Sequence, residues 1–355
     1  MSPRQIRMRS VVTEHQSGKR LDAYLHTLHY TELEKDFSPS RSYLQKWIFE
    51  GFVSVNDVHC IDKSRHVKTG DVISIDAIIE DYPEIPPPEP LDIQIVYRDD
   101  FIVVIDKPPG ISSHPVPYKL RGTVVNFLKS EGIKLPLSSH PLRPGIVHRL
   151  DKNTSGLMVI ACTDKGMSTL IEMIKNREVN RVYMALVCGS PPMDSGTVDA
   201  SIQRHQRDRK KMSVSRSASA RHARTHFKVM VRYPAFTLMS CTLDTGRTHQ
   251  IRVHMSHLGY PVAGDPTYGG RKIHARVEKY IGSMKKKDPK FEITSKLLYE
   301  VADLITSDQV HLLHAARLSF AHPITGDKLS LKTEPHEKFG KVIALLEKLN
   351  ERVVA

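Results

Sequence analysis

The chain has 355 residues, enough for two domains with one sizeable hydrophobic core beside a smaller unit. Its 52 Lys and Arg residues outnumber 39 Asp and Glu, so the formal net charge of +13 favours a polyanionic partner such as nucleic acid. Basic residues dispersed for solubility alone are the alternative interpretation.

The same composition argues against several classes of protein. The 4 cysteines are scattered without a C-x-x-C pair, which predicts neither a zinc site nor a disulfide framework. No apolar segment follows the basic N-terminal residues, and no apolar run reaches about eighteen residues, so we expect neither export nor a membrane partner. We therefore expect a cytoplasmic protein that is a monomer.

The first 79 residues predict a small unit of helices and strands. Residues 20–22 open one helix, and residues 38–41 place an N-cap and a proline before a second helix that ends at Gly51. Residues 52–55 and 71–75 have the composition of strands.

A proline-rich segment then divides the chain. Residues 80–91 disfavour both helix and strand and predict a semi-rigid linker. We therefore expect an N-terminal domain over 1–79, this linker over 80–91, and a larger domain over 92–355.

The larger domain alternates strands and helices without a regular βαβ repeat. Residues 91–97 and 101–106 predict two strands joined by a short turn, hence an antiparallel pair, and residues 236–243 predict another strand. The predicted fold class is α+β, with a central mixed, mainly antiparallel sheet and flanking helices.

Asp151 lies in a turn between two apolar segments, residues 144–147 and 157–161. The second segment predicts a buried strand, so the acid is on a loop held by a rigid scaffold, where reactive groups concentrate. A carboxylate can be a nucleophile or a general base, but it needs a partner to stay ionised once water is excluded. A turn-forming or helix-capping aspartate is the alternative.

Arg252 is the candidate partner. Ile251, Met255 and Leu258 recur at helical spacing and Gly259 closes the segment, so Arg252 projects from a defined helix. The nearby residues His249, His254 and His257 suggest a metal site, but the H-E-x-x-H order is missing and we predict no metal.

The run from His148 to Leu157 resembles the catalytic motif of the RluA-type RNA pseudouridine synthases. Other family motifs follow the same order within residues 93–335: they are matched by residues 106–110, 181–187, 245–255, 264–270, 313–315 and 320–323. The chain is most similar to the RluD-like branch, which acts on large-subunit ribosomal RNA.

This resemblance implies the pseudouridine synthase fold, with a central cleft for the substrate. It makes Asp151 the essential acid, which either adds to the anomeric carbon of the sugar or removes a sugar proton; the sequence leaves both routes open. Arg252 would pair with Asp151, Tyr183 would pack against the target base, and Arg149 would fill the space left by the flipped nucleotide. No cofactor is implied, because the reaction is an isomerisation, and no nucleotide-binding signature occurs.

The N-terminal unit resembles the small S-four-like (alpha-L) RNA-binding domain. Lys19, Arg20, Arg41 and Lys46 would then contact the RNA backbone, although a solvated helix face is the alternative for each of them.

Two functions follow from these patterns. The first is an isomerase that converts specific uridines to pseudouridine in RNA, above all in large-subunit ribosomal RNA or a pre-ribosomal particle. The second is a non-catalytic ribosomal-RNA-binding assembly factor with the same fold. Residues 271–310 predict helix in part, and they are either an RNA contact or a decorated surface.

Overall fold

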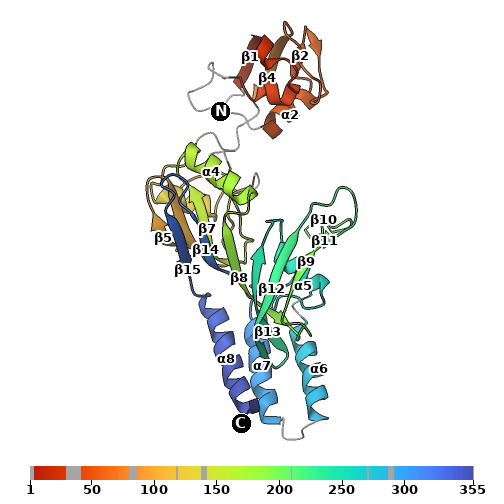
Figure 1. Cartoon of the computed structure of the whole chain (residues 1–355), viewed down its shortest axis with the longest axis vertical. Helices are drawn as coiled ribbons and strands as arrows, with labels where there is room; N and C mark the ends of the chain where they lie inside the picture. The colour runs from red at the N-terminus through yellow and green to blue at the C-terminus, as the bar shows by residue number, and fades with distance from the viewer. Residues whose placement is uncertain are drawn as a thin grey trace.

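The computed structural model describes residues 4–28, 41–79, 86–116, 119–136, 142–208, 210–269, 272–286 and 292–354. Figure 1 shows its helices and strands in the colours of the chain order.

The N-terminal unit is built on a four-stranded sheet in the order β1-β4-β2-β3. Its elements are β1 (Arg4–Val11), η1 (Glu14–Gln16), α1 (Leu21–Leu25), α2 (Arg41–Phe49), β2 (Val53–Val55), β3 (Val58–His59) and β4 (Val72–Ile79). Asn56 and Asp57 both have positive φ, as a two-residue hairpin between β2 and β3 requires. The predicted helices and strands are confirmed where described, whereas β1 was not predicted and residues 38–40 lie outside the described residues.

Residues 86–91, the described part of the predicted linker, lie along α3 (Val124–Ser130). The Asn126 side-chain amide donates to Pro87 O over 2.7 Å, and the Gly122 N–H donates to Glu89 Oε2 over 2.7 Å. This end of the segment is therefore held against the larger unit rather than running free, while the domain boundaries stay a prediction.

The larger unit contains one sheet of nine strands among its described residues. Besides α3, its elements are β5 (Gln94–Arg98), β6 (Ile102–Lys107), β7 (Ser155–Ala161), α4 (Asp164–Lys175), β8 (Asn180–Cys188), β9 (Ser195–Asp199), β10 (Ile202–Arg204), β11 (Met212–Val214), β12 (Arg224–Tyr233), β13 (Phe236–Leu243), α5 (Gln250–His257), α6 (Ile273–Lys285), α7 (Glu292–Thr306), β14 (Leu313–Ala321), β15 (Lys328–Lys332) and α8 (Glu337–Val354).

The sheet runs β5-β6-β7-β14-β8-β13-β12-β9, with β15 paired to β14 and a separate β10–β11 hairpin. Only β7 and β14 pair in parallel among these strands, so the prediction of a mixed, mainly antiparallel sheet is confirmed. Gly156 makes the parallel pair possible, because a Cβ on it would lie 2.4 Å from the backbone oxygen of Ala315. The late strand β14 thus joins the two halves of the sheet, as Figure 1 shows.

Helices cover both faces of this sheet. One face buries Val103, Met158, Tyr183 and Met239 against α3 and α5. On the other face, α4 packs on β6 and β7, while α6, α7 and α8 pack on β8, β12 and β13 and gather at one end of the molecule in Figure 1. The helical prediction for residues 271–310 is confirmed by α6 and α7. None of the described helices is long and apolar enough to cross a membrane.

Candidate active site

The loop that carries Asp151 is pinned on both sides before it enters β7. Ser113 Oγ accepts the Leu150 N–H over 3.0 Å and donates to Leu150 O over 2.8 Å. The Thr154 N–H closes a turn onto Asp151 O, and the Thr154 hydroxyl lies 2.8 Å from Nε2 of the buried residue His311. The carboxylate therefore sits on a rigid turn, as the sequence predicts.

Lys107 holds the same loop through hydrogen bonds to its backbone. Its fully buried ammonium donates to the carbonyls of Pro108, Ile111 and Lys152, at 2.8, 2.9 and 3.2 Å. Burial lowers the pKa of Lys107 to about 7, against the opposing pull of Asp151 and Asp106. This lysine belongs to the matched motif over residues 106–110 and holds the backbone next to the turn that carries Asp151.

Arg252 bridges two carboxylates at the bottom of the site. Its Nη1 lies 2.9 Å from Asp151 Oδ2, while Nε and Nη2 make a bidentate pair with Asp265 at 2.7 and 3.0 Å. All three side chains are nearly buried, with Arg252 at 6% and Asp151 at 14% exposure. The pairing of Asp151 with Arg252 that the resemblance implies is present in the geometry.

These contacts keep Asp151 charged. Burial alone would raise the pKa of Asp151, but His249 and Arg252 outweigh it and hold that pKa below its usual value. Burial likewise opposes the charge of Arg252, and Asp265 and Asp151 raise the pKa of Arg252 above its usual range. Asp151 is therefore an anion at neutral pH.

His249 and Tyr268 complete the surroundings of Asp151. His249 adopts a left-handed backbone at the start of α5, with φ of 59° and ψ of 18°. Its Nδ1 lies 2.8 Å from the Tyr268 hydroxyl and its Nε2 3.9 Å from Asp151 Oδ2. The Tyr268 ring also lies 5.1 Å from the guanidinium carbon of Arg252, so it packs against the group that pairs with Asp151.

Tyr183 lies in β8 on the sheet face toward the same cavity and is 6% exposed. Burial, followed by the charge of Asp151, raises the pKa of Tyr183 although Arg181 opposes the shift. Its phenol therefore stays protonated at neutral pH.

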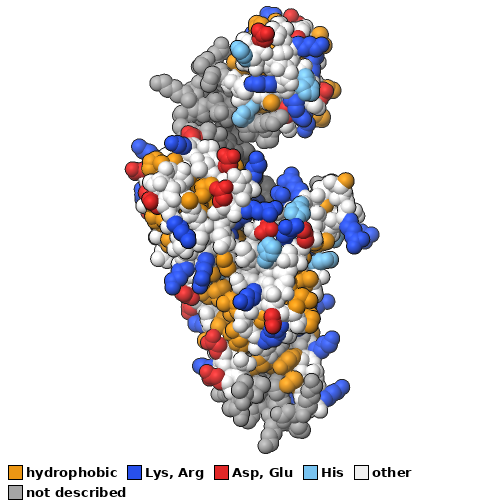
Figure 2. All heavy atoms as spheres, in the orientation of Figure 1, with side chains coloured by type: hydrophobic (Ala, Val, Ile, Leu, Met, Phe, Trp, Pro, Cys, Tyr) orange, Lys and Arg blue, Asp and Glu red, His pale blue; other side chains and the backbone are white. Residues whose placement is uncertain are grey.

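Asp151, Tyr183, His249 and Arg252 line a cavity of about 650 Å³. Only Asp151 and Asp244 contribute carboxylates to its described lining. Its cations are Arg143, Arg149, Lys175, Arg177, Arg181, Arg247 and Arg252. Figure 2 shows Lys, Arg and His side chains gathered around the hollow between α4 and the β9–β12 part of the sheet. An excess of positive charge around a concave site suits an RNA substrate.

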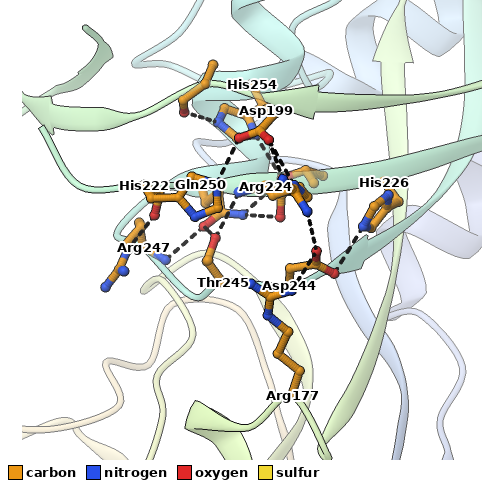
Figure 3. Close-up of polar contacts among 12 residues, drawn as sticks. Arg177, Asp199, His222, Arg224, His226, Asp244, Thr245, Arg247, Gln250 and His254 are labelled. Carbon is orange, nitrogen blue, oxygen red and sulfur yellow. Dashed lines mark hydrogen bonds and ion pairs between the residues drawn. The ribbon is translucent and has the colours of Figure 1, made fainter. Parts of the chain in front are cut away.

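An ion-pair network reaches the wall of the cavity through Arg177 and Asp244, and Figure 3 shows how its members converge. Arg224 donates from Nε and Nη2 to Asp199 Oδ2 at 2.9 and 2.6 Å, and its Nη1 lies 3.7 Å from Asp244. Asp244 also contacts His226 at 3.0 Å and Arg177, just beyond α4, at 3.6 Å. The network thus links the end of α4 to the end of β13 across the wall.

Gln250 fixes the loop that leads into α5. Its side-chain oxygen accepts the Thr245 hydroxyl at 2.8 Å and the Arg247 N–H at 3.0 Å, and its side-chain nitrogen donates to Arg224 O over 2.9 Å. The Gln250 contacts appear beside the ion pairs in Figure 3. This loop sets the position of α5 and with it the position of Arg252.

The structure brings Asp151, Tyr183, Arg252 and the exposed side chain of Arg149 to one cavity. Lys19 is exposed in the N-terminal unit, whereas Arg20 lies 3.2 Å from the buried carboxylate of Asp22 and so has a structural role too. The remaining two predicted RNA contacts, Arg41 and Lys46, belong to α2, and their side chains lie outside the described residues.

The sequence predicts no role for Asp265, although Asp265 lies in the matched motif over residues 264–270. The signal was available in principle, because a buried arginine needs more than one acceptor for its five N–H groups. His249 and Tyr268 were missed because their contacts join loops that are far apart in the chain.

Two of the three histidines considered for a metal site, His249 and His254, are engaged otherwise, and His257 is exposed. His254 is fully buried, with its ring nitrogens 2.8 Å from Thr225 Oγ1 and 3.0 Å from Ala200 O. Within the described part of the chain, no group of three or more His, Cys, Asp or Glu side chains is arranged to hold a metal ion.

The chain is similar in sequence to known proteins. The sequence profile of a family described as RNA pseudouridylate synthase matches residues 101–257. The chain is 35% identical over 344 residues to the "Uncharacterized RNA pseudouridine synthase YlyB" of Bacillus subtilis, covering 95% of this chain and 97% of that protein. It is 37% identical over 349 residues to the "Ribosomal large subunit pseudouridine synthase D" of Vibrio cholerae, covering 98% of each.

Solved structures show the same fold. The structure titled "Human RNA Pseudouridylate Synthase Domain Containing 4" has 25% sequence identity and a TM-score of 0.51, covering 71% of this chain and 92% of that one. The structure titled "Human RNA Pseudouridylate Synthase Domain Containing 1" has 21% identity and the same TM-score of 0.51, covering 76% and 97%.

Proposed function

The chain belongs to the family of RNA pseudouridine synthases, which are isomerases, and we propose that Asp151 is the carboxylate with which it converts uridines of large-subunit ribosomal RNA. The observation that carries this assignment is the pairing of Asp151 with Arg252 inside a cavity lined by cations. The names of the relatives support ribosomal RNA as the substrate.

The reaction breaks the bond between N1 of uracil and C1′ of ribose, rotates the base, and joins C5 to C1′. The proton on C5 leaves and N1 gains one, so no atoms or electrons pass to a cofactor. Asp151 can begin this either by adding to C1′ or by taking a ribose proton to give a glycal, and both routes need the ionised carboxylate. Its lowered pKa provides that state at neutral pH.

Arg252 orients the carboxylate in this scheme. Because Asp265 binds the guanidinium at Nε and Nη2, only Nη1 is directed at Asp151, and its direction is fixed. Asp265 is therefore a positioning residue that acts on the reaction through Arg252.

Tyr183 and Arg149 are proposed to stabilise the flipped-out state of the target uridine. A uridine in folded RNA must leave its stack to reach the cavity, at a cost of a few kcal/mol that contacts in the pocket must offset. Tyr183 presents a protonated aromatic side chain on the sheet floor, which favours packing against the base over removal of a proton. Arg149 is exposed at the cavity, two residues before Asp151, and is assigned to the space that the base vacates.

The N-terminal unit is assigned to docking of RNA, in the manner of an S-four-like domain, with Lys19, Arg20, Arg41 and Lys46 as contacts. Action on ribosomal RNA supports a cytoplasmic location as part of this proposal, and the enzyme is proposed to act as a monomer.

Mapping pseudouridines in total RNA from cells with and without the protein tests the function. We expect specific large-subunit positions to lose the modification, and to regain it with the parent protein but not with Asp151→Asn, which removes charge at little change in volume. Purified Asp151→Asn should still bind the RNA. An assembly factor without catalysis would instead leave the pseudouridine map unchanged in cells that lack the protein.

A further inference from the structure

Arg181 is a buried charge without a partner among the described residues. It lies in β8 at 5% exposure, and its buried Nε makes no hydrogen bond within the described chain. Neither an ion pair nor a hydrogen bond of the remaining guanidinium nitrogens is found among the described residues. A buried guanidinium in this state is costly unless an anion joins it.

The surroundings leave room for such an anion. Arg181 lines the cavity of Asp151 and shares its sheet face with Tyr183, two residues along the strand. Gly246, in the loop before α5, has no side chain where a Cβ would lie 3.1 Å from Arg181 Nη1. The guanidinium thus occupies space that any other residue at Gly246 would restrict.

No carboxylate of the described cavity lining is free to pair with Arg181. Asp151 and Asp244 are the only carboxylates of the described lining, and Asp151 is bound to Arg252. Asp244 is shared among Arg177, Arg224 and His226. The counter-charge for Arg181 therefore has to come from the substrate.

We propose that Arg181 binds a phosphodiester next to the target uridine and thereby holds that nucleotide over Tyr183. Phosphate is the group of RNA that carries a full negative charge before any bond breaks, and a guanidinium fork matches its oxygens bidentately. The assignment rests on the proposed function and adds a substrate contact to it.

A binding experiment with neutralised phosphates tests this contact. The probes are a synthetic RNA stem-loop that contains a mapped target uridine, and the same RNA with a methylphosphonate at the 5′ or the 3′ phosphate of that uridine. Dissociation constants are measured with full-length Asp151→Asn and with Asp151→Asn/Arg181→Gln. We expect one neutral linkage to weaken binding about tenfold or more, Arg181→Gln to weaken it similarly, and the two changes together to cost no more than one.

Lys175→Gln is the matched control, because it removes one positive charge at an exposed position of the same cavity. The effects of Lys175→Gln and of the neutral linkage on the dissociation constant should be independent, so that their fold-changes multiply. Arg181→Lys, which keeps the charge but loses the fork, should still respond to the methylphosphonate. Thermal unfolding of Arg181→Gln should occur no lower than in the parent, since an unpaired buried charge is removed.

Effects of Arg181→Gln that multiply with those of both linkages would overturn the proposal. A second outcome would also overturn it: Arg181→Gln leaves the dissociation constant unchanged but, in the protein that retains Asp151, slows single turnover. That result would assign Arg181 to the departing uracil instead. Failure of the proposed function is separate from either result, because then the parent protein would form no pseudouridine in the unmodified stem-loop.

Discussion

Replacing Asp265 with asparagine should destabilise the protein by about 3 kcal/mol, because it leaves a buried arginine short of one counter-charge. Asp265 is fully buried and accepts four hydrogen bonds: two from Arg252, one from the Thr267 N–H at 2.8 Å and one from the Tyr268 N–H at 3.2 Å. With the asparagine oxygen kept on the side of three of these donors, its NH₂ group faces Arg252 Nε–H, so donor meets donor.

The magnitude follows from this count. Charge-assisted hydrogen bonds are worth about 1.5–3 kcal/mol each, and breaking a buried ion pair by removing one partner costs about 3–5 kcal/mol. Asparagine retains three of the contacts in weakened form, which places the loss near the lower limit. At ~2–4 °C per kcal/mol for a domain of this size, the melting temperature should fall by roughly 6–12 °C.

Denaturant unfolding of the parent and the variant measures the difference. Asp303→Asn is the matched control: its partner His274 is at 2.8 Å, but the Asp303 side chain is 74% exposed, so the cost should stay under about 1 kcal/mol. Single-turnover pseudouridine formation should fall in Asp265→Asn and remain unchanged in Asp303→Asn. Equal stabilities of the two variants would refute the reasoning from burial.

Three further predictions concern the scaffold, pH and RNA docking. Gly156→Ala should destabilise the protein by more than about 3 kcal/mol, because the added Cβ meets the β14 backbone. Gly282→Ala, with open space around this position of α6, should stabilise the protein by up to about 1 kcal/mol. Thermal melts that rank the two variants the other way contradict this. Burial raises the pKa of Asp265, but Arg252 outweighs burial and holds this pKa below its ordinary value of 3.8. The ionised Asp265 therefore stabilises the folded protein above about pH 4, and this stabilisation is lost as the pH falls through the pKa of the folded state. In acid melts the parent should lose more stability than Asp265→Asn. Deleting residues 1–80 should weaken RNA binding or redirect modification to other positions, and normal rates at normal positions would refute docking by that unit.

The local structure of this chain could be predicted well where periodicity and turn chemistry agree. The strand over 236–243 and the helix around Arg252 appear at those positions, and Gly259 ends the helix with a φ of 90° as predicted. The strand β1 was not predicted, because three of its eight residues are arginines, although Ile6 is buried and residues 6–9 alternate between apolar and charged as in a strand.

The long-range arrangement could not be predicted in the same way. The residues alone made Arg252 only a candidate partner of Asp151, because about a hundred residues separate them; the pairing itself was implied by the family resemblance. Asp265 lies 13 residues beyond Arg252, and its contact depends on a return turn at Gly264, whose φ is 77°. Nothing in local composition shows that Arg181 faces a cavity rather than an acid.

The place of β14 in the sheet has a consequence for synthesis of the protein. Asp151 directly precedes β7 in the half formed by β5 to β7, Arg252 follows the half that contains β8 to β13, and residues 313–321 connect these halves. On a translating ribosome, both halves emerge long before the strand that unites them. The enzyme therefore becomes competent late, once nearly the whole polypeptide has left the exit tunnel, and chains terminated before residue 313 should be inert.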